Sequence, residues 1–251
     1  MKKTLLLKIL LRSFFIHAAL NFRRMQNMGF AFSIIPLIRA WEMGKKDAGA
    51  MLARHLQMYN SHPYFSGPLL GSVVRMEEEK KGAGDAYDVL SFKKGLMGPY
   101  AAIGDYFFWG ALRPFAGIVA VVLAFKGLII APFAFLLIYT PAHLLVRLKG
   151  FFEGYTRGKQ GIEFIRGLNL PRATAITRWL SVVILAVFTV WLSYSEYSLF
   201  VNAPDIFMAV GAIGIVMFSY FLIKKVLSQI YIIYGAVGLF FILVYVREII
   251  S

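Results

Sequence analysis

The sequence predicts an all-α protein that crosses a membrane several times. Of its 251 residues, 59% are hydrophobic and only 16% are charged. Soluble domains contain about 45 to 50% apolar and about 25% charged residues, so this chain has too few charges to cover a water-facing surface. A helix needs roughly 20 residues to cross the hydrocarbon core of a bilayer, and several runs of about that length contain no charge. These runs are 127–146, 179–195, 206–223 and 229–246.

Composition also excludes other classes of protein. The 16% aromatic content is too high for a disordered basic tail, and the absence of Cys rules out a disulfide framework and thiolate chemistry. The formal charge of +14 comes from 27 Lys and Arg against 13 Asp and Glu. Because these basic residues lie beside apolar runs rather than on a polar domain, we expect anionic membrane lipid as a partner and no nucleic acid.

The amino end predicts an amphipathic helix that lies in the membrane interface. At 100° per residue, Thr4, Lys8 and Arg12 form one polar stripe surrounded by leucine, isoleucine and phenylalanine. We expect this stripe to face phospholipid head groups. The same two cations interrupt the apolar stretch and no cleavage site follows, so we expect the segment to remain in the mature protein rather than to act as a signal peptide.

The region before the first apolar run combines one helix with turns. Residues 48–59 predict a helix that ends at the turn-forming sequence Asn-Ser-His-Pro of residues 60–63, and residues 77–88 predict a solvated loop. No internal repeat is present. We therefore expect one membrane domain over 1–251, in which 1–100 is largely cytoplasmic, interfacial and re-entrant and 101–251 spans the membrane.

A fifth apolar run, 115–125, is too short to span a membrane alone. Extending it backwards brings in Asp105, Arg113 and Pro114, which hydrocarbon would not accept facing lipid. This indicates a broken or re-entrant segment around 95–115 that lines protein or water, and about four to five spanning helices in all. Whether 101–125 crosses or re-enters stays open at this point.

The distribution of charge predicts the orientation of the chain. Residues 1–100 contain 15 basic and 7 acidic groups, and 147–178 contain 7 and 2, whereas the loop 196–205 has two acids and no base. Basic loops face the cytoplasm in membrane proteins. If 101–125 crosses once, the amino end is cytoplasmic and the carboxyl end lies outside.

Three blocks of motifs then point to a family. They are NFRRMQNMGFAFSIIP at 21–36, NSHPY and GPLLG at 60–64 and 67–71, and KGLMGPYAAIGD running into FWGALRP over 94–114. In this order they resemble the IID membrane subunit of mannose-type sugar phosphotransferase systems. The resemblance implies a bacterial inner-membrane protein that forms the sugar translocation unit with a IIC subunit. It also implies that cytoplasmic IIB and IIA subunits carry the phosphoryl group and that IID has no catalytic residue.

Several polar and aromatic residues are candidates for contact with a sugar. Asp105 and Arg113 would share one face of a continuous helix. Either Asp105 accepts hydrogen bonds from sugar hydroxyls or fixes the re-entrant loop, or the two residues are satisfied by each other or by neighbours and hold a break in the helix. Gly98 permits either unwound backbone that meets a ligand or close helix packing.

The remaining candidates lie in the 60–64 motif and in the aromatic segment. Asn60 and His62 offer neutral hydrogen-bonding groups, although the same residue types also make ordinary turns. Trp109 offers a ring for the apolar face of a sugar, although aromatic residues at this depth are more often packing residues.

Other functions find less support in the residues. No His-Glu-x-x-His motif, aspartate-rich loop or phosphate-binding loop is present, so we expect neither a metal nor another cofactor. A non-transporting membrane scaffold stays as an alternative. A membrane-bound lipid-modifying enzyme is less favoured, because it would need a cluster of acids or a His-Asp pair near the interface.

Overall fold

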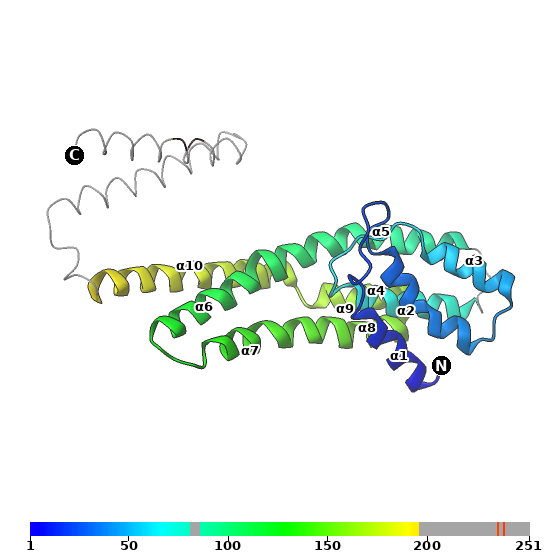
Figure 1. Cartoon of the computed structure of the whole chain (residues 1–251), viewed down its shortest axis with the longest axis horizontal. Coiled ribbons are helices and arrows are strands. Elements are labelled where there is room, and N and C mark those ends of the chain that lie inside the picture. Colours follow the sequence, from blue (N-terminus) through cyan, green and yellow to red (C-terminus); the bar gives the residue numbers. More distant parts are fainter. Residues whose placement is uncertain (81–85, 196–234, 236–237, 239–251) are drawn as a thin grey trace. The chain divides into compact units, whose positions relative to one another are not determined.

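The structure is a computed structural model, and it describes residues 1–80 and 86–195 together with Gly235 and Gly238. Every regular element in these residues is a helix (Figure 1), which confirms the predicted all-α class. The chain divides into two compact units, 1–188 and 189–251, and the description below concerns the first. Apart from the two glycines, the spans predicted at 206–223 and 229–246 lie outside the described residues.

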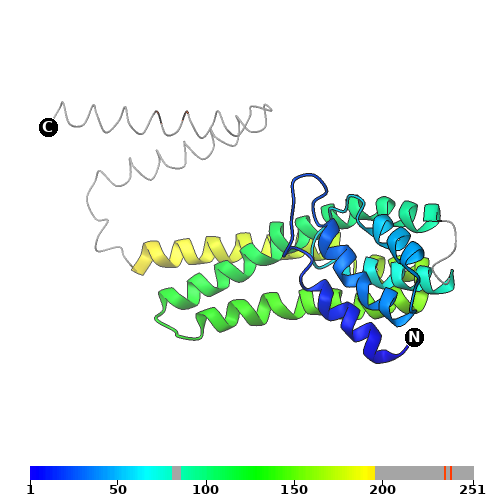
Figure 2. The ribbon, with the colours of Figure 1, turned by 45° about the vertical axis from the view of Figure 1, so that its right-hand side comes forward.

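The first two helices lie side by side, as both ribbon views show (Figure 2). Helix α1 (Lys3–Ser13) packs along α2 (Asn27–Ala40), so the predicted amino-terminal helix is confirmed. Its apolar face contacts protein rather than lipid, because Leu6, Ile9 and Leu10 are buried. A different set of apolar side chains on or next to α1 is exposed, namely those of Leu7, Leu11, Phe14 and Phe15.

Helix α3 (Lys45–His55) overlaps the helix predicted at 48–59 but ends earlier, so the 60–63 turn lies in a longer loop. Helix α4 (Ser66–Glu79) includes Glu77, which is fully buried against α3. The prediction of a solvated loop over 77–88 was therefore wrong at its start and again from residue 86, where the next helix begins. The cluster of acids misled it, because Glu77 is paired inside the protein and only its neighbours face solvent.

The next stretch of chain is one continuous helical rod. It consists of α5 (Ala86–Gly104), a π-helical segment η1 (Asp105–Leu112) and α6 (Arg113–Phe125). The break predicted around 95–115 takes a milder form, since the backbone stays helical and widens into a π-helix. Pro114 cannot donate to the carbonyl of Gly110 one turn earlier, and that carbonyl instead accepts from Nε of Arg178 at 3.2 Å.

A tight turn joins α6 to α7 (Ala131–Leu144) and creates a helical hairpin. Gly127 adopts a positive φ of 73°, the amide of Leu128 donates to the carbonyl of Leu123, and the amide of Gly127 donates to that of Ala124. These bonds form the Schellman arrangement that ends helices at glycine. The turn of the hairpin therefore lies at Gly127. The first charge-free run of the sequence starts at the same residue.

After the hairpin the chain remains helical where the sequence predicts a basic cytoplasmic loop, 147–178. This region contains η2 (Leu145–Lys149), α8 (Gly150–Arg157), a 3-10 turn η3 (Gly158–Gly161), α9 (Ile162–Gly167) and the start of α10 (Leu170–Ser195). The prediction of a basic segment between two apolar stretches named no helices there; they form because α8 packs closely along α4, and tertiary packing stabilises helices that charge patterns alone do not reveal.

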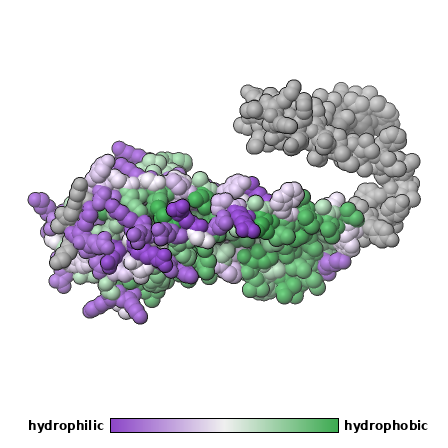
Figure 3. Space-filling view, turned by 180° about the vertical axis from the view of Figure 1, so that it is seen from behind, coloured by the Kyte–Doolittle hydropathy of each residue, from purple (hydrophilic) through white to green (hydrophobic). Residues whose placement is uncertain are grey.

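One end of the first unit is apolar and the other polar (Figure 3). Two helical stretches, Tyr87–Phe125 and Ala131–Leu192, are long and apolar enough to cross a membrane. The apolar windows of these stretches are only 28% and 0% buried, and Ile129 and Leu137 are 90% and 69% exposed. Water does not favour such surfaces, so they must face lipid or other protein.

Candidate functional site

The three sequence blocks that carry the family resemblance meet at one place in the structure. The first contact joins the Gln26 side chain to the turn at residues 60–64. Its Nε2 donates to the Ser61 carbonyl at 2.7 Å, and its Oε1 accepts from the Ser61 amide at 3.1 Å. The backbone amide of Gln26 also donates to the carbonyl of Tyr59 at 2.8 Å. These hydrogen bonds hold the turn against the amino end of α2.

The third block closes over His62, which is 1% exposed. Its ring stacks on Phe108 with centroids 5.3 Å apart and lies 4.7 Å from the Trp109 ring, both in η1. Gly104 touches the imidazole so closely that a Cβ there would overlap the Cβ and Cγ of His62. The absence of a side chain at position 104 is thus what lets the long helix approach the turn.

His62 retains one polar atom with no partner among the described residues, its Nε2. Burial, with further positive charge from His17 and Arg147, lowers the pKa of His62 to about 3, so the ring is neutral at pH 7. Its Nδ1 accepts from the Tyr64 amide at 3.3 Å. A neutral ring that accepts at Nδ1 carries its proton on Nε2. The structure therefore holds an unused N–H donor beside Trp109.

The far side of the turn connects to α7 and η2. The hydroxyls of Tyr64 and Tyr139 lie 3.0 Å apart, and the Tyr64 ring stacks on His143 with centroids 4.5 Å apart. Arg147 donates from Nη2 to the carbonyl of Pro63 at 3.0 Å. Buried nitrogens of two of these side chains, His143 Nδ1 and Arg147 Nε, also lack partners within the described part of the chain. The cluster thus offers several hydrogen-bonding groups that its own residues leave unused.

Of the site residues predicted from the sequence, His62 and Trp109 lie in contact. Asp105 is exposed one turn before Trp109, and no ion pair joins it to Arg113 among the described residues. The alternative of a mutual Asp105–Arg113 pair that holds a helix break is therefore not what the structure shows. Asn60 is exposed at the edge of the turn.

Gly98 lies away from this cluster, on an exposed face within regular α5 helix, and a Cβ there would meet nothing within 4 Å. Neither alternative considered for this residue, unwound backbone or close helix packing, is present within the described residues. Gly104, not Gly98, is the glycine of this block at which close packing occurs.

Sequence reasoning missed four participants in the cluster, which are Gln26, Tyr139, His143 and Arg147. The sequence did contain a signal for His143 and one for Arg147. His143 is a titratable residue inside an otherwise charge-free run, and Arg147 is the first charge after that run. Gln26 had no such signal, because only the folded chain brings residue 26 to residue 61. Within the described residues, no group of three or more His, Cys, Asp or Glu could hold a metal ion.

The fold and this cluster define a helical membrane protein with a polar and aromatic site where its apolar helices begin. A sequence profile of the PTS system mannose/fructose/sorbose family IID component matches residues 1–249, and the chain belongs to this family. The resemblance found in the three motif blocks is thereby confirmed.

Individual relatives agree with this membership. The mannose-specific EIID component of Escherichia coli (strain K12) is 32% identical over 169 residues, which are 66% of this chain and 60% of that relative. The sorbose-specific EIID component of Lacticaseibacillus casei is 29% identical over 243 residues, or 89% of this chain and 86% of the relative. The chain thus matches about 60% of the length of the Escherichia coli protein but most of the Lacticaseibacillus protein.

Solved structures share the fold. A chain described as a membrane protein aligns with a TM-score of 0.73 at 24% identity, covering 98% of this chain and 97% of its own. A chain from the cryo-EM structure of the mannose transporter ManYZ with microcin E492 aligns with a TM-score of 0.61 at 23% identity, covering 100% and 97%. The chain therefore shares its fold with these two proteins.

Proposed function

We propose that the chain is the IID subunit of a bacterial sugar uptake system, in which it forms the translocation unit with a IIC subunit. The observation that carries this proposal is the family profile, which matches 1–249. Relatives are named as mannose-specific, fructose and sorbose components, so the proposed substrate is a hexose or a related sugar. Phosphoryl transfer is assigned to cytoplasmic IIB, supplied by IIA, and not to this chain.

The exposed face of the α5–η1–α6 rod supports a partner subunit in the membrane. Asp105, Trp109 and Arg113 follow one another at four-residue intervals, and all three are exposed. A charged side chain at the centre of a helix in hydrocarbon costs about 2.5 to 3.5 kcal/mol. Because no described residue pairs with Asp105, a second protein or a water-lined path must cover this face. A IIC subunit would meet that requirement.

The cluster around His62 supports contact with a neutral, hydroxylated ligand. The Trp109 ring is exposed and can stack on the apolar face of a sugar, and the Nε2–H of His62, buried beside it, is a donor without charge. A sugar that enters such a site loses its water, and hydrogen bonds of this kind offset that cost. Once IIB has phosphorylated the sugar, the charge of the sugar phosphate prevents its return through an apolar path. Uptake is then directional.

The same proposal places the chain in the inner membrane with its amino end in the cytoplasm. One end of the first unit is hydrophilic (Figure 3), and residues 1–100 contain 15 basic and 7 acidic groups, as the positive-inside rule requires of a cytoplasmic segment. Anionic lipid is proposed to contact this surface.

Uptake in a strain that supplies the cognate IIC, IIB and IIA subunits tests the proposal. With the chain present, labelled mannose, fructose or sorbose should accumulate as the phosphorylated sugar, and deletion of the chain should abolish accumulation. If none of the three sugars accumulates although IIC co-purifies with the chain, the assignment as a sugar transporter is wrong.

Asp105→Asn then tests the exposed face, with Asp47→Asn on the surface of α3 as a matched control. We expect the Asp105 variant to reduce uptake about tenfold or more, on the scale of one charged hydrogen bond, whereas the control retains full uptake. Pull-down of IIC separates loss of sugar contact from loss of assembly. Full uptake with normal assembly would remove Asp105 from the site.

A further inference from the structure

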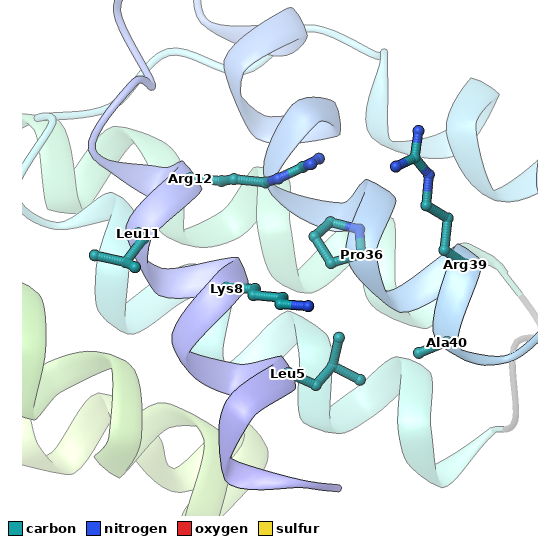
Figure 4. Close-up of a pocket in the computed structure, with 7 residues that line it drawn as sticks. All are labelled: Leu5, Lys8, Leu11, Arg12, Pro36, Arg39 and Ala40. Atoms are coloured by element: carbon teal, nitrogen blue, oxygen red, sulfur yellow. The ribbon is translucent and has the colours of Figure 1, made fainter.

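A pocket lined by cations lies between α1 and α2, outside the site described above. It has a volume of about 550 Å³ (Figure 4). Lys8 and Arg12 project into it from α1, and Arg39 lies across from them on α2, on the other side of Pro36. The remaining lining is apolar and consists of Leu5, Leu11, Pro36 and Ala40.

The positive charge of this pocket is not neutralised by the protein. No carboxylate lines it, and none of the three cations forms an ion pair with a described residue. The acid of α4 that lies nearest the start of α1, Glu78, is already paired with the amino group of Met1 at 2.9 Å. Three cations around one cavity repel one another, so the pocket is suited to an anion.

A separate apolar groove lies beyond the carboxyl end of α1, between residues 15–19 and the first turns of α2. It has a volume of about 340 Å³ and is lined by Phe15, Ala18, Ala19, Met28, Gly29 and Phe32. Arg12 connects the two cavities, because its guanidinium lies 4.4 Å from the centroid of the Phe32 ring and its Nη1 donates to the Phe32 carbonyl at 3.2 Å. Arg12 therefore adjoins both the cationic pocket and the apolar groove.

The order of the two cavities matches the polarity of the molecule. The apolar groove lies at the carboxyl end of α1, where Phe14 is stacked under the Arg147 guanidinium at 4.4 Å. Arg147 is the first charge after the charge-free run 127–146, so it marks the level at which the apolar helices end. The cationic pocket lies further along α1, towards the amino end of the chain.

We propose that the cationic pocket and the apolar groove together bind one anionic phospholipid. Its phosphodiester lies among Lys8, Arg12 and Arg39, and one acyl chain lies in the groove beside Phe15 and Phe32. The adjoining apolar cavity favours a lipid over a free phosphate, because a soluble phosphate would leave that surface exposed to water. Fixed in this way, α1 anchors the polar end of the protein at the membrane surface, independently of sugar transport.

The test uses the full chain purified in detergent, with retained lipid counted by native mass spectrometry. We expect one phosphatidylglycerol per chain to be retained in preference to phosphatidylethanolamine. Each cation near a lipid surface contributes about 1 kcal/mol, so the double variant Lys8→Gln/Arg39→Gln should weaken phosphatidylglycerol binding about thirtyfold. The matched control Lys45→Gln/Lys46→Gln removes the same charge from an exposed part of α3 and should bind as the parent does.

Two further arms identify the occupant. Ala18→Trp, which fills the apolar groove, should weaken retention of phosphatidylglycerol while the cations stay intact. Inorganic phosphate at millimolar concentration should not displace the lipid; if it does so fully, the pocket binds free phosphate and the proposal is wrong. Equal retention of both lipids, or unchanged binding by the Lys8/Arg39 variant, would also overturn it. The proposal would also be overturned if the Lys8/Arg39 or the Ala18 variant lost association with the IIC subunit but kept its lipid, since the groove would then be a protein interface.

Discussion

His62 and His55 both lie inside the protein as neutral rings, although only one of them belongs to the candidate site. His55 is fully buried, with its Nε2 3.0 Å from Oε1 of Glu77, which also lies 3.4 Å from Nε of Arg54. Lys93 donates to the His55 carbonyl at 3.2 Å from the opposite side. This network joins α3, α4 and α5 below the 60–64 turn, and breaking a buried pair of this kind costs about 3 to 5 kcal/mol.

The two histidines predict a loss of stability in mild acid. Burial lowers the pKa of both rings from 6.5, so the unfolded chain binds more protons than the folded chain below about pH 6.5. Stability is therefore complete above that pH and falls as pH decreases. With a pKa of about 3, His62 should lower the free energy of unfolding by roughly 1.4 kcal/mol between pH 7.5 and pH 5.5. His55 acts in the same direction. Thermal unfolding of the purified chain across this range measures the effect.

His62→Asn provides the comparison for that experiment, because asparagine keeps polar atoms but does not titrate. This variant should be less stable at pH 7.5 and should depend less steeply on pH than the parent chain. An identical slope for the two proteins would show that His62 does not contribute to the pH dependence.

Among the elements, α4 and α8 are packed most closely, and glycines at their contact make this possible. A Cβ at Gly71 would overlap the carbonyl oxygen of Phe151, and one at Gly154 would overlap that of Pro68. The small residues let the two backbones approach within contact distance. Because α8 follows η2 directly, this contact also positions Arg147 against the 60–64 turn.

Gly71→Ala is therefore expected to destabilise the chain by about 1 to 3 kcal/mol, the cost of overpacking a tight contact. Gly49→Ala is the matched control, since a Cβ at this exposed position on α3 would meet nothing within 4 Å. The control should be neutral or more stable by about 0.5 to 1 kcal/mol, because alanine favours helix interiors. Unfolding midpoints of both variants decide the matter, and equal midpoints would contradict the close α4–α8 contact.

At the scale of the whole molecule, the hairpin of α6 and α7 decides how far the first unit reaches into the membrane. The continuous helix from Ala131 to Arg147 has 17 residues and a length of about 25 Å, at the lower end of the range that spans a bilayer. If Arg147 lies at the cytoplasmic interface, as proposed, the turn at Ile129 should reach the opposite surface. We therefore expect the hairpin to cross the membrane rather than to re-enter.

Cysteine labelling tests this topology directly, because the chain has no native Cys. In spheroplasts, a membrane-impermeant maleimide should react with Ile129→Cys, which is at a position 90% exposed in the structure. Lys46→Cys on α3 should react only after the membrane is permeabilised. Reaction of both positions from the same side would show that the hairpin re-enters.

Some features of the fold and site follow from local sequence, and others do not. The amphipathic helix α1, the start of a charge-free run at Gly127 and the candidates His62 and Trp109 are visible as patterns. The helices between 147 and 178 were missed because they depend on the packing of α8 against α4. The place of Glu77 inside α4 was missed because it depends on pairing with His55 of α3. The contact of Gln26 with Ser61 joins residues far apart in sequence, and no periodicity reports such a pair.

Composition was sufficient to specify a helical membrane protein, because hydrocarbon and water impose their requirements on every stretch of chain separately. The order of the motifs was sufficient to indicate its family and two residues of its candidate site. The tertiary structure decided which polar atoms keep an unused hydrogen bond, which glycine makes room for His62, and that Asp105 and Arg113 do not pair. It also showed that the basic stripe of α1 borders a pocket closed by α2. These properties depend on distances between distant segments, and only the folded chain sets those distances.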